Sequence, residues 1–427
     1  MKKPARSSRG GSGNRNSVRG APSFEQILDA RRMLSRWLEP TPLLPCAPLS
    51  RLSGREVRLK AENLHVVGSF KIRGAYNRIA RLAKRRGVIA ASAGNHAQGV
   101  ALAARMIGLP ATIVMPQETP LIKVERTRGH GAEVILHGDS FEEAFKEASD
   151  LCARRGLTFV HAYEVRDVMA GQGTIALEIL EVFPDLDAIL VPVGGGGLIS
   201  GIALAARALN PKVAIIGIQA KQAAPVSRAF GSRGRAPAPL ARAETIADAI
   251  RFKKASDVTL PIIRAHVDEM LEVTEEEISE AIVRLVEESK LVAEGAGAVG
   301  VAALLAGRVP ARHGRVCAVI SGGNIDLNLI ARVVEQGLSR SNRYLVVRAQ
   351  VPDKPGRLLA ILSHMAQRQI NVLDVVHRRA GWSVPLGNVE IELLVETRNA
   401  LHAAEVINSL SAAGYAVSRV APARARR

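Results

Sequence analysis

Between residues 86 and 330 the sequence alternates short apolar runs with helical patterns, and this alternation restricts the fold more than any other feature. The apolar runs are Val88–Ala93, Ala111–Met115, Glu133–Leu136, Thr158–His161, Ala188–Val193, Ala214–Ile218 and Val316–Ile320. Helical patterns such as Phe141–Arg154 and Leu198–Ala208 separate most of them. Such alternation indicates βαβ units around a buried, mainly parallel sheet. We therefore expect an α/β core of two lobes with a cleft between them.

The pattern changes near residue 342, which predicts a separate small domain over residues 343–420. A turn, Asp353-Lys354-Pro355-Gly356, follows its first strand. The expected strands are Tyr344–Val351, Ile370–His377, Val389–Thr397 and Tyr415–Val420, and the expected helices are Arg357–Arg368 and Asn399–Ala412. The order βαββαβ in about 75 residues is that of a ferredoxin-like fold.

Residues 1–23 are expected to be a disordered basic tail, and residues 24–340 the core, with a small lobe over about residues 61–164 inserted in a larger one. The tail has six Lys or Arg and no acid, and residues 421–427 add three, so the tails carry nine of the net +18 charges. Elsewhere the charges are interspersed, whereas a nucleic-acid site clusters Lys and Arg on one face. Solvated tails therefore explain the charge better than a specific nucleic-acid partner.

Three distant cysteines, Cys46, Cys152 and Cys317, show neither metal-ligand spacing nor a disulfide framework, which suits a reducing cytoplasm. No apolar run reaches the roughly 18 residues that span a membrane. The first residues lack the apolar segment of a secretory signal. We therefore expect a cytoplasmic protein with no membrane partner and no metal.

A lysine lies at the start of a predicted helix in Gly68-Ser69-Phe70-Lys71. Ser69 is the expected helix cap, and the positive end of the helix dipole disfavours a cation there. Partial desolvation in a cleft lowers a lysine pKa further, and the neutral amine is the form that makes a Schiff base. Taken alone, however, a lysine in a first helical turn is usually an ordinary surface residue.

Three further motifs each follow a predicted strand. Ala91–Gly99 contains Ser92-Ala93-Gly94-Asn95, whose backbone N–H groups suit a carboxylate. The run Gly194–Gly197 lets the backbone wrap around a phosphate, and it fits neither the dinucleotide fingerprint nor Walker A. In Ser321-Gly322-Gly323-Asn324 a hydroxyl is available to a ring nitrogen. The alternative for each motif, taken alone, is an ordinary structural turn.

Together the four motifs resemble those of the fold type II pyridoxal-phosphate enzymes, most closely the threonine/serine dehydratase branch, over about residues 24–340. Related β-replacement synthases such as cysteine synthase usually carry a Thr-Gly-Asn-Thr type loop where this chain has Ser92–His96. The domain after residue 343, with its Asp-Lys-Pro-Gly turn, looks like an ACT domain. That pairing is similar to threonine ammonia-lyases (threonine dehydratases) with one ACT module.

The resemblance implies a role for each motif residue. Lys71 would carry pyridoxal 5'-phosphate as a Schiff base and then remove the substrate Cα proton, and Ser92 is carried over as a second catalytic residue. Phe70 would pack on the cofactor ring, Asn95 would bind its ring hydroxyl, and Ser321 would face its pyridine nitrogen. The phosphate would bind Gly194, Gly195, Gly196 and Gly197, and the substrate carboxylate Ser92, Ala93, Gly94 and Asn95.

A serine at the pyridine nitrogen, unlike an aspartate, leaves the cofactor a weaker electron sink, which suits β-elimination. The resemblance implies deamination of L-threonine to 2-oxobutanoate and ammonia, with L-serine as a secondary substrate. This is a first step toward isoleucine or in threonine catabolism. The alternatives are a serine or hydroxyaspartate racemase-dehydratase on the same scaffold, or a non-enzymatic amino-acid sensor.

Two departures from the family pattern affect details. Many dehydratases have His-Pro-Phe-Asp-Asp where this chain has His161-Ala162-Tyr163-Glu164-Val165. Relatives that bind a divalent cation carry carboxylates where this chain has Gln219 and Pro225. A tight divalent site is therefore not expected, whereas a weaker monovalent site made of backbone carbonyls stays open.

ACT modules bind amino acids at a subunit interface, near the turn before their first helix. The resemblance therefore implies an amino-acid effector near Asp353 and Gly356, and a homodimer or homotetramer. Gly356 leaves room for close approach, and the helix N-terminus suits a carboxylate. The alternative is a domain that only drives oligomerisation.

Overall fold

The computed structural model describes residues 18–83, 86–232, 237–379 and 385–420. The chain divides between Ile325 and Asp326 into two compact units. Residues 326–340, which we expected with the core, belong to the second unit. Within the described ranges, no helix combines the length and the apolar character needed to cross a bilayer.

A six-stranded sheet forms the large lobe of the first unit, in the order β1-β2-β10-β7-β8-β9, and all neighbours except β1 and β2 pair in parallel. Its strands are β1 (Leu43–Pro45), β2 (Glu56–Lys60), β7 (Ala188–Pro192), β8 (Ala214–Ala220), β9 (Glu269–Val273) and β10 (Arg315–Val319). The strands predicted in 188–193, 214–218 and 316–320 are confirmed. β2 and β9 escaped prediction because charged residues interrupt their apolar ones, as in Glu-Val-Arg-Leu-Lys of β2.

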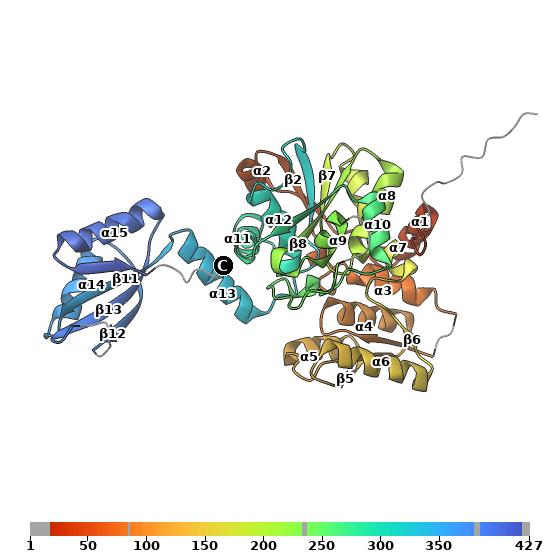
Figure 1. Cartoon of the computed structure of the whole chain (residues 1–427), viewed down its shortest axis with the longest axis horizontal. Coiled ribbons are helices and arrows are strands. Elements are labelled where there is room, and N and C mark those ends of the chain that lie inside the picture. Colours follow the sequence, from red (N-terminus) through yellow and green to blue (C-terminus); the bar gives the residue numbers. More distant parts are fainter. Residues whose placement is uncertain (1–17, 84–85, 233–236, 380–384, 421–427) are drawn as a thin grey trace, which may run out of the picture. The chain divides into compact units, whose positions relative to one another are not determined.

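Helices cover both faces of this sheet, as Figure 1 shows. On one face α8 (Gly197–Leu209) packs on β7 and β8, with α1 (Phe24–Leu34), α7 (Arg166–Val182) and α10 (Thr259–His266) around it. On the other face α12 (Gly295–Leu305) contacts β7, β8, β9 and β10, with α2 (Ala47–Ser53) and α11 (Glu275–Arg284) beside it. The short α9 (Pro225–Gly231) follows β8. Because both faces are covered, β7 and β8 are buried along their whole length.

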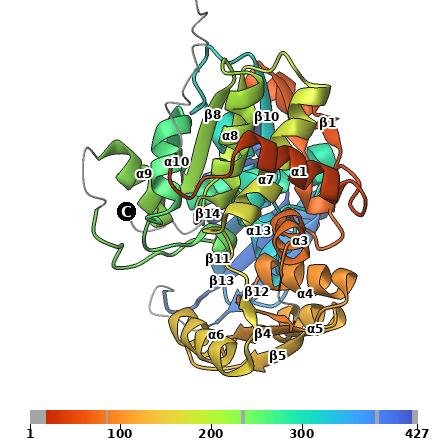
Figure 2. The ribbon, with the colours of Figure 1, turned by 90° about the vertical axis from the view of Figure 1, so that its right-hand side faces the viewer.

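The small lobe contains a four-stranded parallel sheet in the order β5-β4-β3-β6. Its strands are β3 (Val88–Ala91), β4 (Ala111–Met115), β5 (Glu133–Leu136) and β6 (Thr158–Phe159), which confirms the four strands predicted there. The helices α4 (Asn95–Ile107), α5 (Leu121–Gly129) and α6 (Phe141–Arg155) alternate with the strands, and Figure 2 shows this lobe below the large one. α3 (Lys71–Ala80) contacts α4 and also α7 of the large lobe, so it lies at their junction.

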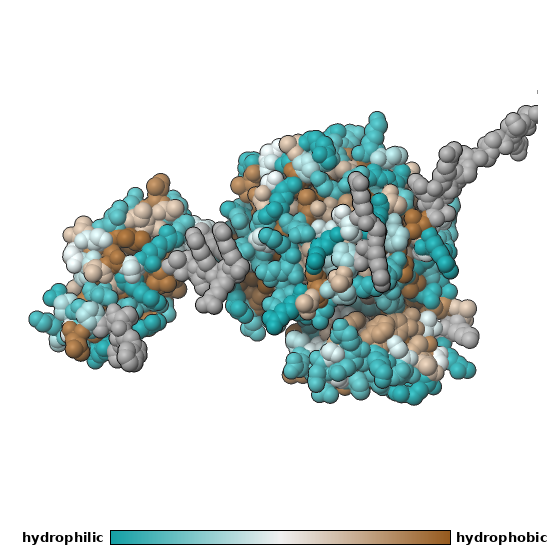
Figure 3. Space-filling view, in the orientation of Figure 1, coloured by the Kyte–Doolittle hydropathy of each residue, from teal (hydrophilic) through white to brown (hydrophobic). Residues whose placement is uncertain are grey.

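The second unit has the predicted βαββαβ order, and its antiparallel sheet runs β12-β13-β11-β14, as in ferredoxin-like folds. Its elements are α13 (Leu327–Arg340), β11 (Tyr344–Pro352), α14 (Arg357–Gln367), β12 (Val372–Arg378), β13 (Asn388–Glu396), α15 (Ala400–Ala412) and β14 (Ala416–Arg419). Alternate residues of β11 and β13, among them Leu345, Ile391 and Leu393, form one core with Ile361 of α14 and Val406 of α15. Hydrophilic side chains cover most of the face of each unit drawn in Figure 3.

Candidate active site

One cavity of the first unit brings residues of all four motifs together. The predicted residues that line it are Phe70, Lys71, Asn95, Gly194, Gly195, Gly196, Gly197 and Ser321. The loops after β7 and β10 supply four of these residues, and the first residues of α3, α4 and α8 supply three more, Lys71, Asn95 and Gly197. Ligand sites of open parallel sheets lie in this position, outside the carboxyl ends of the strands.

Lys71 is the first residue of α3, and its side chain is half-buried. Its Nζ lies 3.4 Å from the carbonyl oxygen of Ala162 and 5.1 Å from the centre of the Phe70 ring. Burial lowers the pKa of the Lys71 amine to about 8, and the Glu294 carboxyl opposes this shift only in part. A substantial fraction of neutral, nucleophilic amine is therefore present near pH 8.

The prediction that Ser69 caps α3 is wrong. Phe70 occupies the cap position, and no side chain accepts from the first turn. Ser69 instead forms a β-bridge with Gly322, and the Phe70 N–H donates to the carbonyl of Ser321 (3.1 Å). This pairing draws the segment alongside the fourth motif. The Ser69 hydroxyl is left buried with no hydrogen-bond partner among the described residues.

A buried ion cluster holds α3 in place. Arg73 makes two hydrogen bonds to Glu62 (2.8 and 2.9 Å) and two to Glu178 (2.6 and 2.8 Å). Lys60 Nζ donates to Glu178 Oε2 (2.6 Å) and to the carbonyl of Thr41 (2.5 Å). Burial alone would raise the pKa of Glu62, but the charge and hydrogen bonds of Arg73, together with the charges of His65 and Lys60, outweigh burial and bring that pKa to about 2. The cluster therefore ties the lysine-bearing helix to β2 and α7 of the large lobe.

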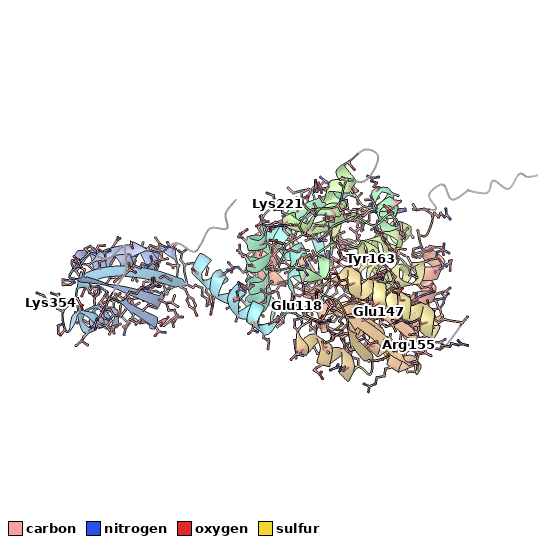
Figure 4. The ribbon with its side chains drawn as sticks, turned by 60° about the horizontal axis from the view of Figure 1, so that its bottom comes forward. Glu118, Glu147, Arg155, Tyr163, Lys221 and Lys354 are labelled. Carbon is pink, nitrogen blue, oxygen red and sulfur yellow. The ribbon has the colours of Figure 1, made fainter. Side chains whose placement is uncertain are left out.

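The glycine loop between β7 and α8 has no room for side chains. A Cβ on Gly195 would lie 2.4 Å from the Tyr163 ring, and a Cβ on Gly196 would lie 2.5 Å from Thr259 Oγ1. Gly196 also has a φ of +88°, which favours glycine. α8 begins at Gly197, so the positive end of a helix lies at the cavity. A phosphate fits this cradle, and Figure 4 places Tyr163 near the junction of the two lobes.

The predicted carboxylate loop lies next to the cavity, but only its last residue lines it. Ser92, Ala93 and Gly94 are half-buried and lead from β3 to α4, which begins at Asn95. The Ser92 N–H donates to the carbonyl of Val114 (3.1 Å), and the Gly94 N–H donates to Ser92 Oγ (3.2 Å). A carboxylate that binds to the Gly94 N–H group therefore has to replace the Ser92 hydroxyl there.

Glu294 is a cavity residue that sequence reasoning missed. It is only 4% exposed, and its Oε1 accepts a hydrogen bond from Asn95 Nδ2 (2.7 Å). Burial and the negative charge of Asp248 raise its pKa to about 8, against the opposing influence of Asn95 and Lys123. Glu294 directly precedes α12 and belongs to none of the four motifs. The available signal was an acid that precedes an otherwise wholly apolar helix, α12.

The cavity wall also includes residues from a segment with no helical or strand pattern, and these were missed for that reason. They are Ala249, Ile250 and Phe252. The Phe252 ring lies 5.4 Å from that of Tyr163, edge to face. Tyr163 belongs to the segment that departs from the dehydratase pattern, so this departure contributes to the cavity wall.

Two other predicted features concern metals and effectors. The described residues contain no group of three or more His, Cys, Asp or Glu placed to hold a metal ion. Gln219 donates from Nε2 to the carbonyl of Val193 (2.9 Å) and accepts from Ser227 N at Oε1 (2.9 Å).

In the second unit, Asp353 and Gly356 lie in the turn between β11 and α14. Gly356 has a φ of +86°, and a Cβ there would have no atom within 4 Å.

Comparisons with known proteins agree with this arrangement. The model of the pyridoxal-phosphate dependent enzyme family matches residues 34–322. An L-threonine ammonia-lyase of Thermotoga maritima is 48% identical over 398 residues, which cover 92% of this chain and 98% of that protein. A catabolic L-threonine dehydratase of Staphylococcus aureus is 43% identical over 324 residues, which cover 74% of this chain and 93% of that protein.

Solved structures extend the likeness to the fold. The processed form of threonine deaminase isoform 2 from Solanum lycopersicum matches with a TM-score of 0.69 at 34% identity, covering 73% of this chain and 92% of that one. The two-lobed fold type II core implied by the motifs is therefore confirmed. Pyridoxal phosphate fits the cavity, which combines an amine of lowered pKa with a glycine cradle. The chain thus belongs to the pyridoxal-phosphate dependent enzymes and, within them, to the family of the L-threonine ammonia-lyases.

Proposed function

We propose that the chain deaminates L-threonine by β-elimination to 2-oxobutanoate and ammonia, with L-serine as a secondary substrate. One observation carries the proposal: the Lys71 amine, with its pKa lowered to about 8, shares a cavity with a four-glycine loop at a helix start. Lys71 would hold the aldehyde carbon of pyridoxal phosphate, and Gly194, Gly195, Gly196 and Gly197 its phosphate. When bound, the cofactor withdraws electrons from the substrate carbon next to the amine.

Different side chains around the cofactor would transfer the proton, hold the ring and bind the substrate carboxylate. Lys71, once neutral, takes the Cα proton, and the β-hydroxyl leaves as water, so that hydrolysis of the resulting enamine gives the 2-oxo acid and ammonia. Phe70 would pack on the ring, and Asn95 would bind the ring oxygen. The neutral Ser321 hydroxyl would meet the pyridine nitrogen, which keeps the ring a modest electron sink and favours elimination over transamination. Ser92, Ala93 and Gly94 would bind the substrate carboxylate.

Substitution of the lysine tests the proposal. Lys71→Ala should lose both the visible absorption band of the bound cofactor and the release of 2-oxobutanoate from L-threonine. Lys146→Ala, on the exposed side of α6, serves as the control and should keep both. Retention of the band and of turnover by Lys71→Ala would contradict the proposal.

A substrate panel separates the lyase from a racemase on the same scaffold. L- and D-hydroxy amino acids are scored for 2-oxo acid release and for the chirality of the remaining substrate. We expect the largest 2-oxo acid release from L-threonine and no change of chirality. Inversion of L-serine faster than 2-oxo acid release would favour the racemase instead.

We propose further that the second unit is an ACT module that binds a small amino acid near Asp353 and Gly356. The support is the βαββαβ order and the open turn at the start of α14. Titration of isoleucine, valine, serine and threonine in the activity assay should reveal one effector with a coupling of about 1–3 kcal/mol. No response to any of the four would leave oligomerisation as the role of this unit.

We also propose a homodimer or homotetramer in the cytoplasm. The support is the expected ACT module, which places effectors between subunits, and the free thiols of Cys46, Cys152 and Cys317. Sedimentation equilibrium of the full chain measures the assembly directly. A monomer at all concentrations would contradict this part of the proposal.

A further inference from the structure

A chain of hydrogen bonds connects the motifs beside the cavity. Asn324 Nδ2 donates to the carbonyl of Val67 (2.8 Å) and to Asn95 Oδ1 (2.7 Å). Asn95 Nδ2 in turn donates to Glu294 Oε1 (2.7 Å). Asn95 and Glu294 are only 7% and 4% exposed, so bulk water does not compete for these bonds.

The Val67 carbonyl determines which group donates and which accepts in each of these hydrogen bonds. A backbone carbonyl only accepts, so the Asn324 group that faces it must be the NH2 group. The same Nδ2 faces Asn95, which therefore has to present its oxygen. The Asn95 NH2 group is left to face Glu294. Contacts that begin at a backbone atom thus establish an amide orientation that is otherwise often ambiguous.

Two glycines of the motifs, Gly68 and Gly322, leave space for the side chains of this hydrogen-bond chain. A Cβ on Gly68 would lie 2.6 Å from Asn324 Oδ1. A Cβ on Gly322 would lie 2.5 Å from Glu294 Oε1 and 3.0 Å from Asn95 Nδ2. These glycines had no role in the proposed chemistry, and the hydrogen-bond chain accounts for both.

We propose that Glu294 is a positioning residue, which together with Asn324 locks Asn95 so that its amide can only donate into the cavity. Asn324 donates a hydrogen bond to Asn95 Oδ1, and Glu294 accepts one from the first hydrogen of Asn95 Nδ2. The second hydrogen has no hydrogen-bond partner among the described residues. Because Asn95 lines the cavity, a ligand atom that meets this hydrogen has to be an acceptor.

This inference rests on the proposed cofactor role of the cavity and adds a preference to it. The ring oxygen of pyridoxal phosphate is an acceptor when deprotonated, whereas a ring hydroxyl that donates finds no acceptor on Asn95. The locked amide therefore selects the cofactor with an anionic ring oxygen. Exchange of the two amide atoms of Asn95 would reverse this preference. Asn324, which the Val67 carbonyl holds with its NH2 group toward Asn95, prevents the exchange, and Glu294 supplies the acceptor for the Asn95 NH2 group.

The test compares variants that were stripped of cofactor and titrated with pyridoxal phosphate, and it measures the dissociation constant and the absorption maximum. Glu294→Gln keeps an oxygen that accepts from Asn95, so we expect both quantities within about twofold of wild type. Glu294→Ala removes the acceptor, so the dissociation constant should rise on the order of tenfold and the absorption maximum should shift. In Asn324→Asp a carboxylate oxygen would replace the NH2 group that donates to the Val67 carbonyl and to Asn95 Oδ1. The Asn95 amide should then rotate to present its NH2 group to this carboxylate, so we expect the same defect.

Asp187→Ala is the control for a general loss of stability. Its carboxylate accepts from the N–H groups of Gly314 and Arg315 (both 2.8 Å). Asp187 directly precedes β7, whereas the glycine loop follows the other end of that strand. We expect normal cofactor binding in this variant.

Two results would overturn the inference. One is a Glu294→Ala protein with the dissociation constant and the absorption maximum of wild type. The other is a Glu294→Gln protein as defective as Glu294→Ala, because the charge of the carboxyl rather than its acceptor oxygen would then matter. A wild-type protein that takes up no pyridoxal phosphate would instead contradict the proposed function.

Discussion

Lys71 and Glu294 line the same cavity, and burial moves the pKa of each toward 8 from opposite sides. Burial favours the neutral form of both groups, because an isolated charge is costly away from water. Each group slightly opposes the shift of the other through their attraction. Below pH 8 the neutral carboxyl therefore predominates, and around pH 8 the neutral amine becomes available for chemistry.

The raised pKa of Glu294 predicts how stability changes with pH. Between its ordinary value of 4.5 and about 8, the folded protein keeps a proton that the unfolded chain has lost. The free energy of unfolding should therefore fall as pH rises through this window, by at most about 1.4 kcal/mol per pH unit. Glu294→Gln should lack this contribution. Urea unfolding of the cofactor-free protein at several pH values measures it, and parallel pH curves for both proteins would refute the prediction.

Residue chemistry could be predicted from sequence where a motif is local. Lys71, Gly194–Gly197, Asn95 and Ser321 were all expected, and all line the cavity. Glu294 was not expected, because its importance comes from Asn95, about 200 positions away along the chain and in direct contact with it. Ser69 was placed wrongly because its β-bridge to Gly322 is a long-range contact that overrides local capping preference.

At the scale of elements, the position of α3 depends on its buried ion cluster. Arg73→Met would leave Glu62 and Glu178 buried with one fewer cation, so we expect a loss of about 3–5 kcal/mol in the free energy of unfolding. Arg154→Met, which removes an exposed ion pair with Glu147, is the control and should change it by less than about 1 kcal/mol. Equal effects of the two substitutions in urea unfolding would show that the cluster does not anchor the helix.

The loop before α8 offers a second prediction at this scale. Gly196→Ala would combine a φ of +88° with a Cβ 2.5 Å from Thr259 Oγ1, so both stability and cofactor affinity should fall, the former by about 1–3 kcal/mol. Gly307→Ala is matched in backbone, with a φ of +65°, but its Cβ would meet nothing within 4 Å. The Gly307 variant should lose about 1 kcal/mol or less and bind cofactor normally. Calorimetry and cofactor titration compare the two, and equal cofactor affinities would contradict the crowding argument.

The elements that sequence reasoning could place are those with an unbroken local pattern. The buried strands β7 and β8 are continuous apolar runs, and β11 alternates strictly, so all three were predicted. β2 has charged residues at alternate positions, and its pairing with β10 depends on residues far along the chain. Sheet order and lobe membership are likewise products of long-range pairing, which periodicity does not contain.

At the scale of the molecule, the described core clusters fall wholly within one unit or the other. A unit with its own core can fold alone. The Staphylococcus aureus dehydratase supports this division, because its match covers 93% of that protein but only 74% of this chain. A chain that ends at residue 325 should therefore still release 2-oxobutanoate from L-threonine and should lose any effector response. Failure of this shortened chain to fold, judged by circular dichroism, would show that the units depend on each other.

The pairing of β2 with β10 has a consequence during synthesis on the ribosome. Glu56 and Arg315 are register partners, so the large-lobe sheet joins segments that emerge roughly 260 residues apart, a delay on the order of 10–50 s at ordinary elongation rates. The small-lobe strands, all between residues 88 and 159, have no such wait. The cavity needs Ser321, so the nascent chain acquires its cofactor site only when the whole first unit has left the exit tunnel.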